Sequence, residues 1–224
     1  MKNINYFLLL VLLFFSACGK KKQKVSADFL HKQSLQVLQH EQAGEVAWRN
    51  ALGLLEQALV VDPKKPECWA LKGSLLLLLG MPQLSIDAFD RSLQHATMPA
   101  KRAEILNNYA CTLAELGREQ EAFAKWGEAL AIPSYLTPEV VYCNQGQYWL
   151  RKNNFDNALA AFDRAVNLAA EYSDAHFYRA VALFHLKKYG QAHDAVVTLL
   201  AFDPQYQPAQ ALKSELAVRM SPAI

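Results

Sequence analysis

Four cysteines and six histidines are the residues of this sequence that could most readily carry chemistry. Cys18 directly follows an apolar run, which leaves Cys68, Cys111 and Cys143 as an odd set that cannot pair completely within one chain. The sequence has no Cys-x-x-Cys pair, and no two histidines stand one helical turn apart, so the ligand spacing of a zinc site is missing. We therefore expect no metal.

The histidines also lack the neighbours that catalysis requires. None stands near a serine or cysteine nucleophile with an orienting acid, and the sequence has no glycine-rich phosphate loop. Acid pairs such as Glu119 and Glu121 are typical of solvated charges on a helix. The sequence therefore predicts a protein that is not an enzyme and holds no cofactor.

Charge along the chain excludes nucleic acid as a partner. The net charge is +2, but five of the 23 basic residues lie before Val25, at positions 2, 20, 21, 22 and 24. The rest of the chain has 18 basic and 21 acidic residues, a balance of −3 that offers no electrostatic footprint for a phosphate backbone. With 52% hydrophobic residues the chain can build a core, and helix-forming residues dominate its composition.

The N-terminus has the pattern of a secretory signal. A lysine is followed by an apolar run from Phe7 to Phe15 that is too short to span a bilayer. Phe15-Ser16-Ala17-Cys18 resembles the lipobox of bacterial lipoproteins, which implies a signal peptide over 1–17, lipidation of Cys18 and a lipidated flexible tether over 18–31. Because Gly19 and not Asp follows, the resemblance implies an outer-membrane anchor with the body in the periplasm. The alternative is a secreted protein with a chance cysteine.

A repeat of about 34 residues fills the remaining chain. Copies run over 32–65, 66–99, 103–136, 139–172 and 173–206. Small residues such as Gly73 and Gly146 recur at the eighth position, where two helices can cross closely, and large residues such as Phe89 and Phe162 recur at the twenty-fourth. The pattern resembles the tetratricopeptide repeat. It predicts an all-α, right-handed superhelical solenoid of about five helix hairpins, with a capping helix and tail over 207–224.

In such a stack the first helices of all hairpins line a concave groove. The positions that point into it combine amides with leucines and aromatics, a mixture suited to an extended or helical peptide of a partner protein. These candidate residues are Leu71, Ser74, Leu78, Asn107, Asn108, Cys111, Asn144, Gln147, Arg151, Phe177, Tyr178 and Val181. Some of them could instead pack helix against helix or face water. Cys111 and Cys143 fall on neighbouring first helices, so they either form a disulfide or remain free thiols, and we favour free thiols.

Two stretches resemble a particular family. Leu106-Asn107-Asn108-Tyr109 opens the third copy, and a Pro-x-Tyr-x-x-Pro junction at 133–138 precedes Asn144-Gln145-Gly146. Together with the lipobox and the repeat number, these features are similar to the type IV pilus biogenesis lipoproteins, or pilotins. The resemblance implies binding of a secretin subunit and help with its outer-membrane localisation and assembly. The alternative is a periplasm-facing adaptor lipoprotein for another envelope complex.

Overall fold

The computed structural model describes residues 25–40 and 44–221, and the regular secondary structure in those ranges is entirely helical. The predicted signal peptide, Cys18 and residues 19–24 lie outside the described residues, as do 222–224. The helices are α2 (Ala27–His40), α3 (Glu45–Val61), α4 (Pro66–Leu78), α5 (Pro82–His95), α6 (Pro99–Glu115), α7 (Glu119–Leu130), α8 (Pro138–Arg151), α9 (Phe155–Leu168), α10 (Ser173–His185), α11 (Tyr189–Phe202) and α12 (Gln207–Met220).

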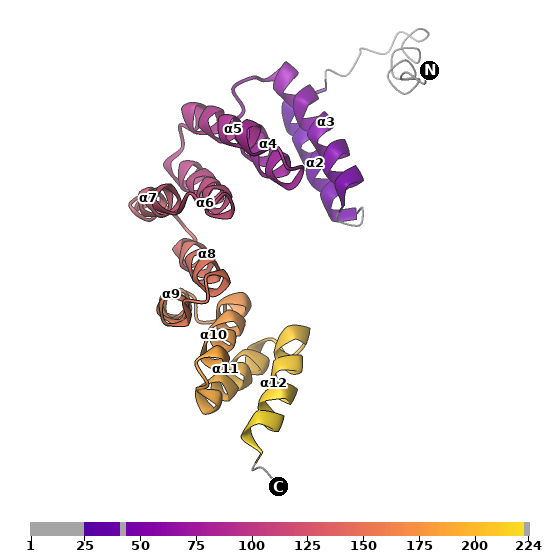
Figure 1. Ribbon diagram of the computed structural model, residues 1–224. Helices are drawn as coiled ribbons and strands as arrows, with labels where there is room; N and C mark the ends of the chain where they lie inside the picture. Colours follow the sequence, from indigo (N-terminus) through magenta and orange to yellow (C-terminus); the bar gives the residue numbers. More distant parts are fainter. Residues whose placement is uncertain (1–24, 41–43, 222–224) are drawn as a thin grey trace.

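Consecutive helices pair into five antiparallel hairpins, from α2–α3 to α10–α11, and α12 closes the stack. The hairpins follow one another along a curved arc (Figure 1). Each first helix from α4 onward contacts the next first helix, whereas each second helix contacts the first helix of the following hairpin. The predicted all-α solenoid of helix hairpins is confirmed, and its first helices lie on the hollowed side.

Small residues set the spacing inside each hairpin, as the repeat pattern predicts. A Cβ atom added to Gly73 would lie 2.8 Å from the ring of Phe89, and one added to Gly146 would lie 2.5 Å from the ring of Phe162. Both rings are fully buried, so no methyl group fits between the two helices. In the third and fifth copies the eighth position is a fully buried alanine, Ala110 and Ala180. The repeat register is therefore correct for the second to fifth copies. In the first copy it is wrong along α2, because Gln39 at the eighth position is exposed and Ser34 is the small residue that is buried.

The first hairpin begins earlier than the sequence suggested. Residues 27–31 were predicted as tether, but they form the first turn of α2. The Ser26 hydroxyl accepts a hydrogen bond from the backbone N–H of Phe29 at 3.1 Å and so caps the helix. Ala27 and Leu30 are buried against α3, which the polar lysine-rich character of the preceding segment concealed.

Helix α6 is also one turn longer than its copy of the repeat. It starts at Pro99, the last residue of the second copy, and runs through the short insertion at 100–102. Proline needs no backbone hydrogen bond at a first helical position, so it starts a helix well. The Arg102 guanidinium donates to the carbonyl oxygen of Leu93 at 2.9 Å, which ties the added turn to the end of α5. Lys101 and Glu104 on this turn reach the hollowed side.

Candidate functional site

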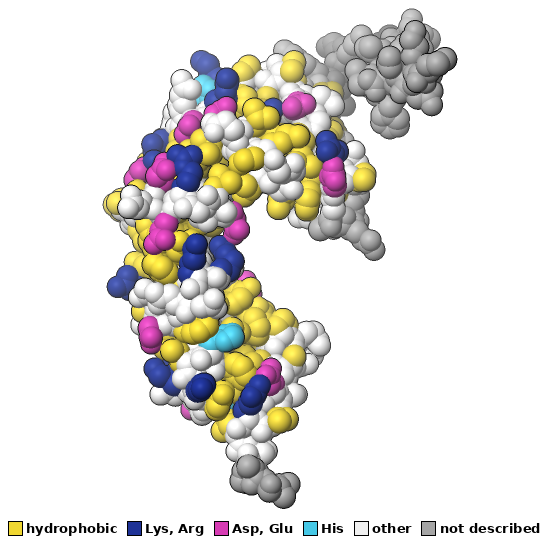
Figure 2. Space-filling view, viewed as in Figure 1, with side chains coloured by type: hydrophobic (Ala, Val, Ile, Leu, Met, Phe, Trp, Pro, Cys, Tyr) yellow, Lys and Arg dark blue, Asp and Glu magenta, His cyan; other side chains and the backbone are white. Residues whose placement is uncertain are grey.

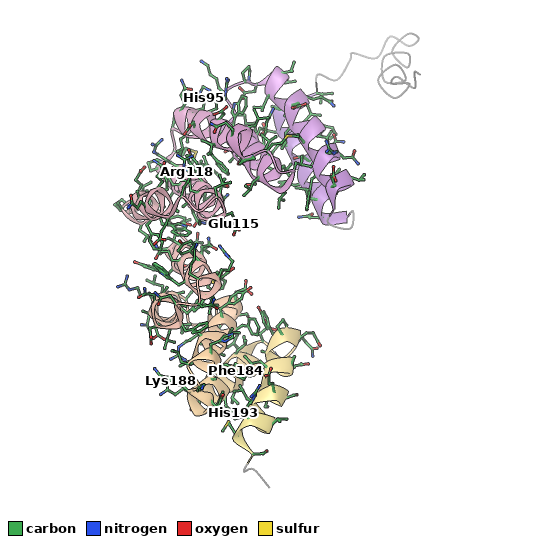
Figure 3. All side chains as sticks on the ribbon, viewed as in Figure 1. His95, Glu115, Arg118, Phe184, Lys188 and His193 are labelled. Carbon is green, nitrogen blue, oxygen red and sulfur yellow. The ribbon has the colours of Figure 1, made fainter. Side chains whose placement is uncertain are left out.

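The hollowed side of the arc is the surface most suited to a partner, because the first helices from α4 to α10 contact one another in turn and α2 shares a pocket with α4 and α6. Apolar side chains gather along it near both ends, over α2–α4 and over α10–α12 (Figure 2). Side chains from α6 such as Glu115 point into the hollow, whereas Lys188 lies on the outer side (Figure 3). We call this surface the inner groove. It is lined by the exposed faces of α2, α4, α6, α8 and α10.

At the N-terminal end the groove deepens into a pocket of about 270 Å³ between α2, α4 and α6. Three predicted residues, Leu71, Ser74 and Asn108, line it together. The other lining residues are His31, Leu35, Glu67, Ala70, Lys101, Glu104 and Ile105. Of these, His31 was missed because it was assigned to the tether, and Lys101 because it was placed in the insertion. The helical spacing of His31 and Leu35, one turn apart, was the available signal.

Charges in this pocket are partly neutralised within it. The Lys101 ammonium pairs with Glu104 at 2.6 Å, while Glu67, also on the pocket wall, forms no ion pair among the described residues. Burial, and secondarily the charge of Lys65, lowers the pKa of His31, so its ring is neutral at pH 7. The pocket therefore offers neutral hydrogen-bonding groups and one surplus carboxylate beside an apolar floor.

Asn107 is not a groove residue, which corrects the prediction. Its side chain is only 5% exposed. Its amide oxygen accepts one hydrogen bond from the Trp126 indole N–H at 3.2 Å and another from the Asn144 side chain at 3.0 Å. Asn107 thus joins α6 to α7 and α8. Position in the repeat alone could not distinguish this buried amide from its exposed neighbour Asn108.

The middle of the groove is polar. Glu115 on α6 and Arg151 on α8 form an ion pair of 2.8 Å across neighbouring first helices, and both side chains are about half exposed. Gln147 donates to the sulfur of Cys143 at 3.6 Å. Cys111 and Cys143 are free thiols, and burial raises the pKa of both, that of Cys111 to about 11. Both are therefore protonated at neutral pH and behave as small hydrophobic side chains.

The C-terminal end of the groove is aromatic. Phe177 lies with its ring centroid 5.3 Å from that of Tyr178 and 5.5 Å from that of Tyr206, which precedes α12. The Tyr206 hydroxyl donates to Asp174 at 2.6 Å and fixes that ring. Val181 is half-buried beside them, whereas Leu78, on α4, is 53% exposed at the end of its helix. The predicted residues therefore form three separate zones and not one compact site.

In the part of the chain that the structure describes, no three His, Cys, Asp or Glu side chains come together as a metal site. Within the same ranges, no helix is both long and apolar enough to cross a bilayer. What the inner groove can do chemically is hold a polypeptide by burial of side chains and by hydrogen bonds to its backbone.

The tetratricopeptide repeat family matches residues 143–206, which span the fourth hairpin from within α8 onward and the whole of the fifth. Residues 143–206 thus carry the tetratricopeptide repeat, and the chain has the fold of a tetratricopeptide-like solenoid of helix hairpins. The structure of PilF from Pseudomonas aeruginosa superposes with a TM-score of 0.67 at 22% identity, covering 86% of this chain and 83% of that one. The structure of PilW, a widely conserved type IV pilus biogenesis factor, superposes with a TM-score of 0.65 at 21% identity, covering 88% of this chain and 95% of PilW.

Yeast Tom70 superposes with a TM-score of 0.69 at 15% identity, covering 87% of this chain and 40% of Tom70. No curated protein matches the sequence. At these identities the likeness shows a shared fold. The fold is thus shared with PilF and with PilW, the second of which is a type IV pilus biogenesis factor.

Proposed function

We propose that this tetratricopeptide-repeat protein is a type IV pilus biogenesis lipoprotein, a pilotin, that binds a secretin subunit and promotes its localisation and assembly in the outer membrane. The observation that carries the proposal is the match of fold over nearly the whole of PilW, joined to the lipobox and the Leu106-Asn107-Asn108-Tyr109 stretch of the sequence. Cys18 carries the acyl chains, and the body faces the periplasm.

The inner groove supplies the binding energy in this proposal. A segment of the secretin subunit lies along α4, α6, α8 and α10, with apolar side chains against Leu71 and Phe177 and its backbone bonded to amides such as Asn108 and Gln147. Two or more acyl chains at Cys18 hold the complex at the membrane, since one chain alone binds reversibly. Tethering then raises the local concentration of secretin subunits at the bilayer, which favours ring assembly.

The test is deletion of the gene followed by detection of secretin multimers in outer-membrane fractions. We expect multimers to be lost and unassembled subunits to remain, and complementation with the parent gene to restore them. Multimers at parental levels would contradict the pilotin function and leave the alternative, an adaptor lipoprotein for another envelope complex.

Complementation with Cys18→Ala tests the anchor separately. This variant should fold, leave the membrane fraction and fail to restore multimers at the outer membrane. If it still sediments with membranes after a high-salt wash, the lipid-anchor part of the proposal is wrong.

A further inference from the structure

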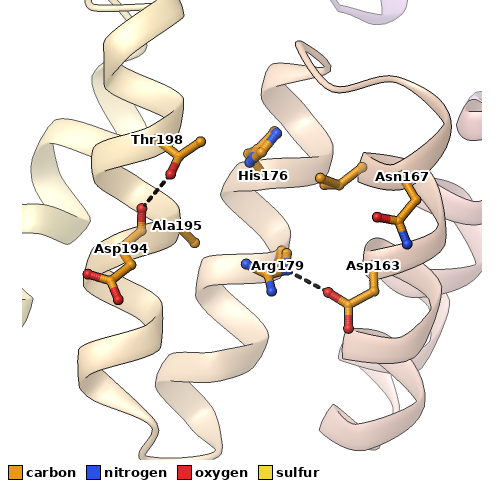
Figure 4. Close-up of a pocket in the computed structure, with 8 residues that line it drawn as sticks. Asp163, Asn167, His176, Arg179, Asp194, Ala195 and Thr198 are labelled. Carbon is orange, nitrogen blue, oxygen red and sulfur yellow. Dashed lines mark hydrogen bonds and ion pairs between the residues drawn. The ribbon is translucent and has the colours of Figure 1, made fainter.

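A second pocket, of about 490 Å³, lies between α9, α10 and α11 and shares no residue with the inner groove. Its lining is Asp163, Val166, Asn167, His176, Arg179, Asp194, Ala195 and Thr198 (Figure 4). His176 and Arg179 project from the side of α10 opposite to Phe177 and Val181, because these pairs stand about half a turn apart on the helix. We call it the outer pocket.

Equivalent positions of the second repeat show what such a pocket holds inside this protein. There the pocket is lined by α3, α4 and α5, and the Arg91 guanidinium lies over the ring of Trp69, 5.1 Å from its centroid. Glu56 pairs with Lys72 at 3.1 Å, and Asp87 completes the charged set. The formal charges of the side chains that line this pocket therefore sum to zero.

The same contact, an arginine guanidinium over an aromatic ring, occurs in the fourth repeat. Arg164, at the same repeat position as Arg91, has its guanidinium 5.6 Å from the ring centroid of Tyr142, at the same position as Trp69. An arginine of the second helix over a flat ring of the first helix is thus a recurrent feature of the outer surface. Cations over aromatic faces are attracted by the ring and gain most when partly desolvated.

In the fifth repeat the arginine is missing. Thr198 stands at the position of Arg91, and the ring is that of His176. The acidic and basic partners remain, since Arg179 donates to Asp163 at 2.6 Å and Asp194 occupies the position of Asp87. The outer pocket therefore has one positive charge fewer than its counterpart. The basic side chain that pairs with Asp194 is His193, whose Nδ1 lies 3.8 Å from the Asp194 Oδ1 and which is charged only when protonated.

His176 independently indicates that a hydrogen-bond donor is missing from the outer pocket. Its side chain is 5% exposed. Its Nε2 lies 2.9 Å from the carbonyl oxygen of Ala170, which can only accept, so Nε2 carries the proton. Nδ1 is then an acceptor, and this buried atom has no hydrogen-bond partner. Buried acceptors without a donor are rare because they lose the hydration they had in the unfolded chain.

We propose that the outer pocket binds the guanidinium of an arginine side chain from a partner polypeptide, in the place that Arg91 and Arg164 fill in other repeats. The His176 ring supplies the flat surface and an unpaired acceptor at its edge. Asp194 supplies the uncompensated charge. This inference is independent of the pilus function proposed above, because it concerns the other face of the stack and would hold for any partner.

The experiment uses the full chain, purified in detergent and labelled with ¹⁵N at histidine only, with the His176 signal assigned from a His176→Phe variant. N-acetyl-arginine methylamide is titrated and the ring resonances are followed by NMR. The neutral isostere N-acetyl-citrulline methylamide and N-acetyl-lysine methylamide serve as matched probes. We expect a saturable shift of the His176 signal with the arginine probe, and none with citrulline. An absent shift, or equal shifts with all three probes, would overturn the proposal.

Variants at exposed positions add a second readout. Thr198→Arg should place the missing guanidinium in the pocket and abolish the response to the probe, whereas Thr198→Val should keep it. Asp194→Asn should weaken binding about two- to fivefold, the usual contribution of an exposed ion pair. A Thr198→Arg variant that binds the arginine probe as the parent does would also overturn the proposal.

Discussion

Gly146 and Phe162 face each other so closely that a Cβ atom on Gly146 would lie 2.5 Å from Cε1 of the phenyl ring. The ring is fully buried between its neighbours, so it has no free space into which it can withdraw. This contact fixes the crossing of α8 and α9, and the contact of Gly73 with Phe89 fixes that of α4 and α5.

Gly146→Ala should therefore lower the free energy of unfolding by about 1–3 kcal/mol, the usual cost of overpacking, and Gly146→Leu should lower it further. Chemical denaturation followed by circular dichroism measures the change. Gly127 is the matched control, because it lies in helix α7 with nothing within 4 Å of an added Cβ. Gly127→Ala should raise stability by up to about 1 kcal/mol through helix propensity. Equal effects at the two glycines would show that the helix crossing was misassigned.

In the second to fifth hairpins the turn between the two helices uses one left-handed residue at the same repeat position. Gly80 and Gly117 have φ of 71° and 73°, but Lys187 has φ of 59° at the equivalent place. Because a side chain is strained there, Lys187→Gly should raise the free energy of unfolding by about 1 kcal/mol. The neighbouring Lys188, with φ of −84°, is the control. Lys188→Gly should bring no gain, and a loss of stability in Lys187→Gly would contradict the account.

Asn107 and its neighbour Asn108 should behave differently when replaced. Asn107→Ala leaves the Trp126 indole N–H buried without an acceptor, so the free energy of unfolding should fall by about 1–3 kcal/mol. Asn108 is exposed in the groove, and Asn108→Ala should change stability by less than about 0.5 kcal/mol. Thermal and urea denaturation measure the free energy of unfolding of both variants. Asn108→Ala as unstable as Asn107→Ala would place both amides in the core.

Much of this architecture could be predicted from the sequence. The small-to-large pairing of Gly73 with Phe89 and of Gly146 with Phe162 predicts which helices cross, because only steric fit at a fixed period is involved. The roles of Asn107 and Asn108 could not be predicted, since one residue separates a buried amide from an exposed one. The burial of Ala27 against α3 was hidden because the chain before it is polar and rich in lysine.

The outer pocket was also missed from sequence, for a related reason. His176 stands at the repeat position of Trp69 and Tyr142, where a large ring packs between helices, so its residue type alone does not indicate an unpaired polar atom. Its unpaired Nδ1 arises from the Ala170 carbonyl oxygen that faces the other ring nitrogen. That geometry depends on how the loop before α10 folds, which periodicity does not specify.

Cys111 should react slowly with thiol reagents although it belongs to the groove helices. Burial raises its pKa to about 11 from an ordinary value of 9.0, so at pH 8 its thiolate fraction falls about a hundredfold. Alkylation by iodoacetamide, followed by mass spectrometry, should be slow at pH 8 and should accelerate as the pH rises towards 11. The urea-unfolded chain is the control. Alkylation of the folded protein at the unfolded rate would show that Cys111 is solvated.

The claim on which the account depends is that the inner groove, and not the outer surface, holds the secretin subunit. Asn108 and Asn157 are both exposed helical asparagines, Asn108 in the groove pocket and Asn157 in a pocket of the outer side. Co-purification of the secretin subunit with full-length lipidated Asn108→Arg and Asn157→Arg variants compares the two faces. We expect Asn108→Arg to reduce the recovered secretin at least tenfold and Asn157→Arg to leave it unchanged. Parental recovery with Asn108→Arg, or equal loss with both variants, would contradict the account.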